Sequence, residues 1–270
     1  MKDLIRVTTP AKIWNALSWA RSIFIFDVII YIYTFVLGTL SLLTSLFDRD
    51  GRIQHGFARL WSWLILHTIF CPVTITGMER LDRSRPHVLA ANHISALDIP
   101  LLYEHLPFQF RIMAKKELFR YPFMGWHLRR SGQIPVDAGS AMASMRSLMR
   151  AVRSLQGGMP LVVFPEGGRS PNGQIQPFMS GAFYIAIKAG VEIIPMAIVG
   201  TYEALPMNSF HIRPGLMELV IGGPIPTAGY SLRDMDVLAA RVQKAVEDLY
   251  YSRSRVPDPR LSAGAMGTQA

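Results

Sequence analysis

The stretch VLAANHISALDIP, residues 88–100, contains the pattern from which the fold can be argued. Its first four residues form a short apolar run typical of a buried strand, and SALD fits the S-x-x-D pattern of a helix start. Asn92 and His93 stand between the two. We therefore expect a strand followed by a helix, with His93 at the end of the strand and Asp98 in the first turn of the helix.

The same alternation continues through the chain after Pro72, where short runs rich in Val and Ile alternate with helical patterns. It predicts a layered α/β domain with a largely parallel sheet flanked by helices. In the clearest helix, 140–156, we expect the methionines to be core and the arginines to be solvated. The expected strands are Val88–Ala91, Phe110–Met113, Gln133–Val136, Leu161–Phe164, Ile193–Val199 and Met217–Ile221, and the expected helices are Ser140–Gln156, Ala182–Ala189 and Leu232–Tyr250.

The N-terminal region is much more apolar. Residues 23–46 carry one charge, Asp27, and roughly 20 helical residues suffice to cross the apolar core of a bilayer. A second apolar stretch, 57–70, is shorter and holds two tryptophans that suit the headgroup level. We expect apolar membrane helices that precede the α/β domain and dip as a hairpin into one leaflet. The alternatives are a spanning first helix and a buried helix of a soluble protein.

The composition favours an anionic partner. Lys and Arg outnumber Asp and Glu by 28 to 19, which gives a net charge of +9 in 270 residues. The basic residues are scattered and no nucleic-acid-binding signature accompanies them, so an acidic lipid surface or a phosphorylated substrate fits better. Cys71 is the single cysteine, which excludes an intramolecular disulfide and fits a reducing compartment.

His93 and Asp98 can be read in two ways. Asp98 could simply cap a helix, with His93 an ordinary loop residue. Alternatively, the carboxylate accepts a hydrogen bond from one ring nitrogen and leaves the other free to take a proton. The sequence contains no G-x-S-x-G, H-E-x-x-H or paired C-x-x-C motif. A lone His–Asp pair suits a reaction in which the substrate brings its own hydroxyl.

A second polar segment is LVVFPEGGRSPNG, residues 161–173, where an apolar run ends in a Gly-Gly turn. Glycines let backbone N–H groups approach a ligand closely, and the guanidinium of Arg169 offers a fork for phosphate. The alternative is a plain turn with a surface arginine.

Together, N-H-x-x-x-x-D and F-P-E-G-x-R-S resemble the glycerolipid acyltransferase family, and within it the bacterial 1-acylglycerol-3-phosphate acyltransferases. Three further blocks also match: AKKELF at 114–119, GQIPVD at 132–137 and EIIPMAI at 192–198. The resemblance covers about residues 70–225, and the order of its blocks makes it specific. It implies a membrane-bound acyltransferase domain of the layered α/β kind.

The resemblance also implies roles for single residues. His93 would be the general base and Asp98 would orient it, while Arg169 and Lys115 would hold the phosphate of the acceptor. Glu166 and Gly167 would shape the acceptor site. The full substrate-binding set is Lys115, Glu166, Gly167, Gly168, Arg169 and Ser170, supported by Asn92, Phe164 and Pro165. Neither a metal nor a cofactor is implied, since acyl-CoA or acyl carrier protein would serve as co-substrate.

The implied reaction moves a fatty acyl group to the free hydroxyl of 1-acyl-sn-glycerol 3-phosphate and forms phosphatidic acid for phospholipid biosynthesis. The expected partners are a lysophospholipid, the acyl donor and the membrane, with no nucleic acid, at the cytoplasmic face of the bacterial inner membrane. Residues 1–70 would associate with the membrane, 71–251 would form the acyltransferase domain and 252–270 would be a disordered tail.

Two positions depart from the family's pattern. Ala138 stands where arginine is usual and Gly168 where threonine is common. The loss of a basic residue opens an alternative acceptor, such as a lyso-ornithine lipid. A different class of protein, a non-enzymatic lipid-binding protein of the same fold, is a further alternative, although a pure binder needs neither His93 nor Asp98.

Overall fold

The computed structural model describes residues 9–48, 50–137 and 139–261, and within them the middle layer is a seven-stranded sheet. The strand order is β1-β7-β6-β2-β5-β3-β4, and only the β6–β7 pair is antiparallel. This arrangement confirms the predicted largely parallel sheet. The strands are β1 Val73–Thr76, β2 Val88–Ala91, β3 Arg111–Lys115, β4 Ile134–Val136, β5 Leu161–Val163, β6 Ile193–Val199 and β7 Met217–Ile221.

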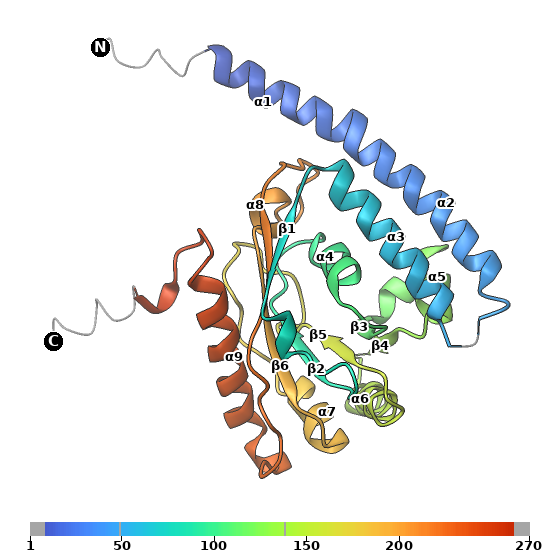
Figure 1. Ribbon diagram of the computed structural model, residues 1–270, viewed down its shortest axis with the longest axis vertical. Helices are drawn as coiled ribbons and strands as arrows, with labels where there is room; N and C mark the ends of the chain where they lie inside the picture. The colour runs from blue at the N-terminus through green and yellow to red at the C-terminus, as the bar shows by residue number, and fades with distance from the viewer. Residues whose placement is uncertain (1–8, 49, 138, 262–270) are drawn as a thin grey trace.

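Helices cover both faces of the sheet (Figure 1). Buried side chains of α3 (Arg52–Thr68) and α4 (Asp98–His105) pack on one face. Those of α6 (Ala141–Gln156), α7 (Gly181–Ala189) and α9 (Met235–Tyr251) pack on the other. The other helical segments are α1 Thr9–Arg21, α2 Val28–Thr44, α5 Met124–Arg130 and α8 Thr201–Ala204, a π-helical turn at Ser22–Asp27, and 3-10 turns at Met78–Arg80, Lys116–Arg120 and Leu232–Asp234.

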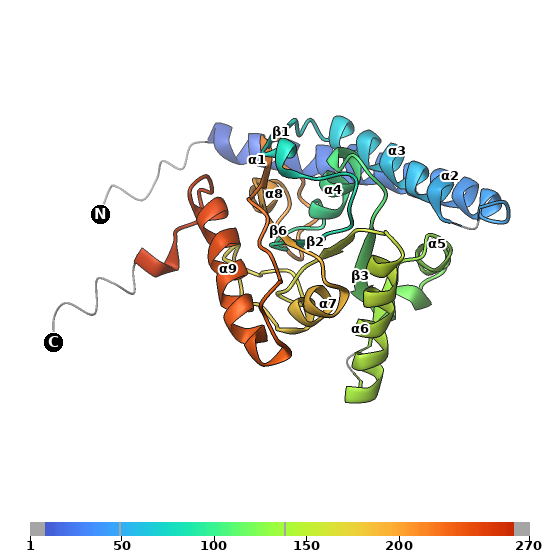
Figure 2. The same ribbon diagram turned by 60° about the horizontal axis from the view of Figure 1, so that its bottom comes forward.

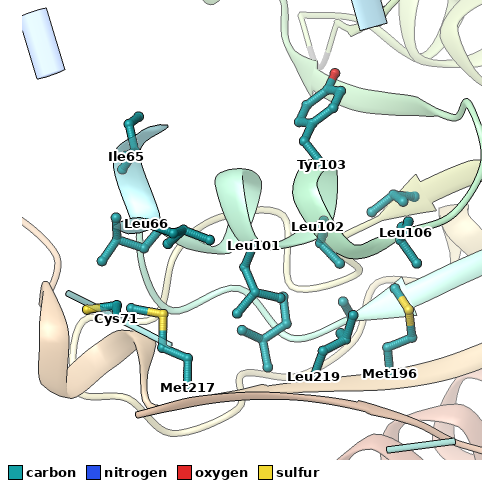
Figure 3. Close-up of a cluster of buried hydrophobic side chains, with 14 of the residues drawn as sticks. Ile65, Leu66, Cys71, Leu101, Leu102, Tyr103, Leu106, Met196, Met217 and Leu219 are labelled. Atoms are coloured by element: carbon teal, nitrogen blue, oxygen red, sulfur yellow. The ribbon is translucent and has the colours of Figure 1, made fainter. Parts of the chain in front are cut away.

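The core beneath α3 and α4 fixes the helix that carries Asp98. Leu101 and Leu102 of α4 are fully buried and meet Met196 and Leu219 of the sheet (Figure 3). Burying one such side chain stabilises a fold by about 1.5–3 kcal/mol. The position of α4 on the sheet is therefore set by packing rather than by its polar first turn.

Three predicted strands, β2, β6 and β7, have the predicted bounds, and the other three differ by one or two residues at their ends. Strand β1 was not predicted. It has four residues at the sheet edge, and three of them are exposed, so the sequence shows no buried apolar run there.

Residues Lys12–Thr44 form one long helix, which takes in α1 from Lys12 onward, the π-helical turn and α2. It is long and apolar enough to cross a membrane. The helix runs along one side of the domain, and α3 returns beside α2, so that the two form a hairpin (Figures 1 and 2).

Helix α3 corrects one expectation. The sequence suggested an interfacial helix at 57–70, yet Ile65, Leu66 and Ile69 are buried in the core against α4. Trp63 remains 47% exposed on the opposite side. The spacing of the buried residues places them on one face, which is why α3 belongs to the domain core.

The methionines of α6 are a second correction. The expected helix is present, with Ser140 as its N-cap, but Met142 and Met145 are exposed. The core is instead contacted by Ala151, Val152 and Leu155 near the other end of the helix. The N-terminal turns of α6 project past the sheet (Figure 2), so their apolar side chains have no core to enter.

Residues 252–261, the first part of the expected disordered tail, are structured. The sequence suggested disorder from residue 252, yet Arg260 pairs with Asp248 of α9 at 2.7 Å and Val256 packs against the core beneath α9. The remainder of the expected tail, 262–270, lies outside the described residues.

Candidate active site

Asn92 fixes the end of strand β2 from which His93 follows. Its side-chain amide donates to the carbonyl of Ile198 at 2.9 Å, and its Oδ1 accepts the N–H of the same residue at 2.7 Å. Asn92 is fully buried. Because β2 and β6 are parallel neighbours, this two-way bond locks their carboxyl ends together. The carboxyl edge of a parallel sheet is where α/β folds place their sites.

His93 and Asp98 are in direct contact. Nδ1 of His93 lies 2.8 Å from Oδ2 of Asp98. Because an ionised carboxylate only accepts hydrogen bonds, Nδ1 carries the proton and Nε2 presents a lone pair. The side chain of His93 is 18% exposed and that of Asp98 is 0% exposed. The arrangement therefore places a proton acceptor toward the surface with a buried carboxylate behind it.

Asp98 receives four hydrogen bonds. Oδ2 also accepts the backbone N–H groups of Ile94 and Ser95, at 2.8 and 2.9 Å, and Oδ1 accepts the hydroxyl of Thr201 at 2.6 Å. The Ser95 bond is one half of the predicted capping box. The Ser95 hydroxyl accepts the N–H of Leu97 at 3.2 Å, not that of Asp98, and donates to the carbonyl of Leu205. Asp98 therefore stabilises the start of helix α4 and at the same time orients the ring of His93.

The segment after β5 packs around His93. The ring of Phe164 stacks on the imidazole, with centroids 4.1 Å apart and planes at 23°. The N–H of Ser170 donates to the carbonyl of His93 at 2.8 Å. Pro165 is buried and its carbonyl accepts the N–H of Met179 at 2.8 Å. The two polar segments singled out in the sequence thus meet in space.

Glu166 braces this loop from within. Its carboxylate accepts the N–H of His93 at 2.6 Å and the N–H of Gln176 at 2.8 Å. Burial raises the pKa of Glu166 to about 8, and the charge of Asp98 adds to the rise, although both N–H donors oppose it. Glu166 therefore holds the backbone of His93, which differs from the acceptor-facing role expected for it.

Lys115 and the Gly-Gly turn lie together. Lys115 ends β3, and its Nζ is 3.9 Å from the place that a Cβ at Gly168 would occupy. Gly167 adopts φ +72°, a left-handed conformation that glycine allows without strain. Arg169 is exposed and makes no ion pair with any residue in the described ranges. Two cations thus flank the turn with ample freedom to meet an anion.

One expected substrate-binding residue is placed differently, and one position that departs from the family's pattern cannot be placed. Ser170 is fully buried, and its hydroxyl bonds to Asn172 within the loop, so it faces no substrate. Ala138 lies outside the described residues. In the part of the chain that the structure describes, no group of three or more His, Cys, Asp or Glu side chains is placed to hold a metal ion.

Thr201 was missed from the sequence. It follows β6 and reaches Asp98 across 103 residues of chain. The sequence shows only that Gly200-Thr201 comes directly after the longest buried strand, and it does not show that the carboxyl end of this strand lies beside that of β2. Gly200 has φ +86°, and a Cβ there would stand 2.3 Å from the carbonyl oxygen of Leu216. Only glycine therefore allows the turn that presents Thr201.

Comparisons with known proteins agree with this architecture. The Acyltransferase family model matches residues 72–199. A 1-acyl-sn-glycerol-3-phosphate acyltransferase of Chlamydomonas reinhardtii is 32% identical over 219 residues, or 80% of this chain and 64% of that protein. A chloroplastic enzyme of the same name from Brassica napus is 34% identical over 183 residues, or 67% of this chain and 53% of that protein.

A solved structure is also similar. The crystal structure of the 1-acyl-sn-glycerophosphate (LPA) acyltransferase PlsC from Thermotoga maritima matches with a TM-score of 0.69 and 29% identity. The match covers 88% of this chain and 97% of that one. The chain spans only about half to two thirds of the length of the plant and algal relatives. The matched family model, the aligned relatives and the shared fold all make this chain similar to the acyltransferase family.

Proposed function

We propose that the protein is a 1-acyl-sn-glycerol-3-phosphate O-acyltransferase. It moves a fatty acyl group from the thioester of acyl-CoA or acyl carrier protein to the free hydroxyl of the lysolipid and forms phosphatidic acid. The observation that carries the proposal is the 2.8 Å contact between His93 and a buried Asp98, beside a turn flanked by Lys115 and Arg169. A proton acceptor next to a cationic turn suits a substrate that has both a hydroxyl and a phosphate.

The chemistry follows from the placement of the imidazole. Nε2 of His93 takes the proton of the acceptor hydroxyl while the oxygen attacks the thioester carbonyl. The positive charge that develops on the ring is balanced by Asp98, which Thr201 and two N–H groups hold in place. When the carbon–sulfur bond breaks, the imidazolium returns the proton to the leaving thiolate. The acyl group passes directly to the acceptor, which accounts for a site without a nucleophilic serine or cysteine.

Lys115 and Arg169 suit recognition of the acceptor phosphate. An arginine can bind phosphate with two parallel N–H donors, whereas a lysine supplies a compact charge. Lys115 lies beside the Gly-Gly turn, and Arg169 directly follows it. The next residue, Ser170, donates its N–H to the carbonyl of His93. A phosphate held at this turn therefore ties the position of the acceptor to that of the base.

We also propose that the long helix lies in the plane of the membrane, in one leaflet. Near its start, Ser18 bonds to His211 at 2.9 Å, and Ser22 donates to the carbonyl of Phe210 and accepts the N–H of Ile212, both at 2.7 Å. Near its end, Ser41 bonds to His127 at 2.9 Å. The distance from Ser18 to Ser41 is about 35 Å, which is about the thickness of the hydrocarbon core. A helix held to one polar domain at both ends has no length left to cross the bilayer.

The side of the membrane follows from the net charge of the protein, and the roles of its regions follow from their positions. A net charge of +9 favours the anionic cytoplasmic leaflet, here that of a bacterial inner membrane. In this proposal residues 1–70 hold the protein on the membrane, residues 71–251 carry the chemistry, and α3 belongs to both because it packs under α2 and over α4.

The decisive experiment measures thiol release from an acyl-CoA with a panel of lysolipids on vesicles. We expect release with 1-acyl-sn-glycerol 3-phosphate and phosphatidic acid as the product. A preference for a lysolipid without a phosphate monoester, such as a lyso-ornithine lipid, would replace the acceptor but keep the acyl transfer. Lipid binding without thiol release for any acceptor would favour the non-enzymatic alternative.

A further inference from the structure

The segment Arg120–Arg130 presents an unusual amount of apolar surface. Tyr121, Phe123, Met124 and Trp126 are between 43% and 57% exposed, although they lie within six residues of one another. Gly125 between them is buried, and a Cβ there would stand 2.2 Å from the carbonyl oxygen of Phe119. The backbone is thus pressed onto the domain while the large side chains point outward. Soluble proteins rarely gather aromatic side chains on the surface without a partner.

This segment lies beside the C-terminal half of the long N-terminal helix in both views (Figures 1 and 2). The rings of Phe123 and Phe35 are 5.8 Å apart, and Ser41 bonds to His127 at 2.9 Å. Phe35 and Leu43 of α2 are themselves 61% exposed. The apolar surface of the segment therefore continues that of α2.

Arginines border the apolar side chains. Arg120, Arg129 and Arg130 are exposed, and none makes an ion pair with any residue in the described part of the chain. Glu117 is the acidic residue that precedes them in the sequence. Lys116, by contrast, is neutralised by Asp137 at 2.6 Å. Aromatic side chains flanked by free arginines match the headgroup layer of an anionic bilayer.

We propose that Arg120–Arg130 is a second membrane-contacting element, which places its aromatic side chains in the headgroup layer and its arginines on anionic lipid. The proposal rests on the in-plane placement of the long helix given above. The proposal has a geometric consequence. If the long helix were the only membrane contact, the domain could rotate about the axis of that helix. A second contact beside the helix prevents this rotation and sets the height of the His93 site above the bilayer.

The test uses full-length protein with a fluorescent label on an introduced cysteine. Met124→Cys reports on the segment. Met142→Cys is its matched control, since Met142 is also exposed and belongs to α6, which extends away from α2 (Figure 2). The protein without an added cysteine measures labelling of Cys71, which is buried. The vesicles contain phosphatidylglycerol and phosphatidylcholine, with and without a quencher on the acyl chains.

We expect the label at 124 to shift its emission to the blue and to be quenched several-fold more than the label at 142. A label at 124 that stays unquenched while the protein cosediments with vesicles would overturn the proposal alone. Failure to cosediment would overturn it together with the membrane placement of the helix. A blue shift at 124 on addition of acyl-CoA without vesicles, with no change on vesicles, would assign the surface to the acyl chain of the donor and likewise overturn it.

The arginines give an independent arm of the test. One arginine near an anionic surface strengthens binding about fivefold, so Arg129→Gln with Arg130→Gln should weaken binding to these vesicles about 20- to 30-fold. The matched control is Arg150→Gln with Arg153→Gln on α6, which should leave the affinity unchanged. Equal losses in both pairs would mean that only the net charge matters, and they would contradict a specific contact by the segment.

Discussion

Asp98 and Arg169 both belong to the candidate active site, yet Asp98 is fully buried among four hydrogen-bond donors whereas Arg169 is exposed. The base side of the site is assembled before any substrate arrives. The anion side consists of exposed cations around a glycine turn, and in the proposed function its geometry is completed by the phosphate of the acceptor. A prebuilt base costs no reorganisation at the moment of reaction, whereas a mobile cation can admit and release a bulky lipid. Substitutions on the two sides should therefore act on different kinetic constants.

The largest effect is expected for His93→Ala. Removal of the ring eliminates the proton acceptor, and general-base catalysis is typically worth about 10²–10⁴-fold. The rate constant for acyl transfer should fall by at least that factor, while circular dichroism and Tm stay close to those of the unchanged protein. Near-normal turnover would refute the assignment of His93 as the base.

Asp98→Asn should follow with a loss of at least about 10²-fold. An asparagine can still accept the N–H groups of Ile94 and Ser95 with its carbonyl oxygen, and its amide can donate to Thr201. It lacks the negative charge that balances a protonated imidazole. We therefore expect a large loss of turnover with a small change in Tm. If turnover instead falls only in step with stability, the carboxylate serves the helix start alone.

Arg169→Ala should raise the KM for the lysolipid by about 10- to 100-fold, because a charge-assisted bond to the phosphate is lost. Arg169→Lys should raise it less, since it keeps the charge but not the two parallel donors. The KM for the acyl donor should move little, and Tm should not change at an exposed site. Arg150→Ala, at an exposed arginine of α6, is the control. Equal weakening of donor and acceptor would assign Arg169 to the donor or to the fold.

Thr201→Val should lower turnover about tenfold, because the buried Oδ1 of Asp98 loses its 2.6 Å donor. Asp98 is then held less firmly behind the imidazole, so the loss should appear in kcat and not in the KM for either substrate.

Two controls separate this effect from loosening of the fold. Thr201→Ser retains the hydroxyl and should restore turnover. Ser95→Ala removes the bonds of the Ser95 hydroxyl to Leu205 and Leu97, neither of which involves Asp98, and should lower turnover much less. Equal losses of turnover in Thr201→Val and Ser95→Ala would count against a specific role for Thr201.

The smallest effect on activity is expected at Glu166, where the pH dependence of stability is the more telling measurement. Its pKa is raised to about 8, so between about 4.5 and 8 the folded state holds a proton that the unfolded state has released. Its contribution is therefore fully present below about pH 4.5 and is lost as the pH rises toward 8, by on the order of a few kcal/mol. Glu166→Gln should flatten this part of the curve in urea unfolding. An unchanged slope would mean that Glu166 is ionised throughout.

Local sequence patterns predicted the features that depend on residues close together in the chain. Short apolar runs next to polar residues or glycine gave β2 and β6 their bounds. The His93–Asp98 contact was accessible because only five residues separate its partners. The contact between Thr201 and Asp98 could not be predicted from the sequence. It depends on two strands, distant in the chain, that lie side by side in the sheet.

The predictions that were wrong share one cause. The direction in which a side chain points depends on the residues packed around it. Met142 has the right helical spacing for a core residue, but the sheet does not extend beneath it. Ser170 stands in a recognisable motif, yet its hydroxyl turns inward to Asn172. Glu166 turns to the backbone of His93 rather than to the exterior. A motif fixes which residues come together, and the packing around them decides which side chains face outward.

The hydrogen bonds of Ser22 to Phe210 and Ile212 also constrain the order of events during synthesis. The long helix emerges from the ribosome first, whereas its docking partners follow 188 and 190 residues later. At about 5–20 residues per second, that interval is roughly 10–40 s. Throughout this time the apolar face of the helix is complete and its polar anchors are unpaired. In the membrane placement proposed above, the domain then folds onto a helix that already rests in lipid, and the nascent chain reaches the bilayer before its candidate active site is assembled.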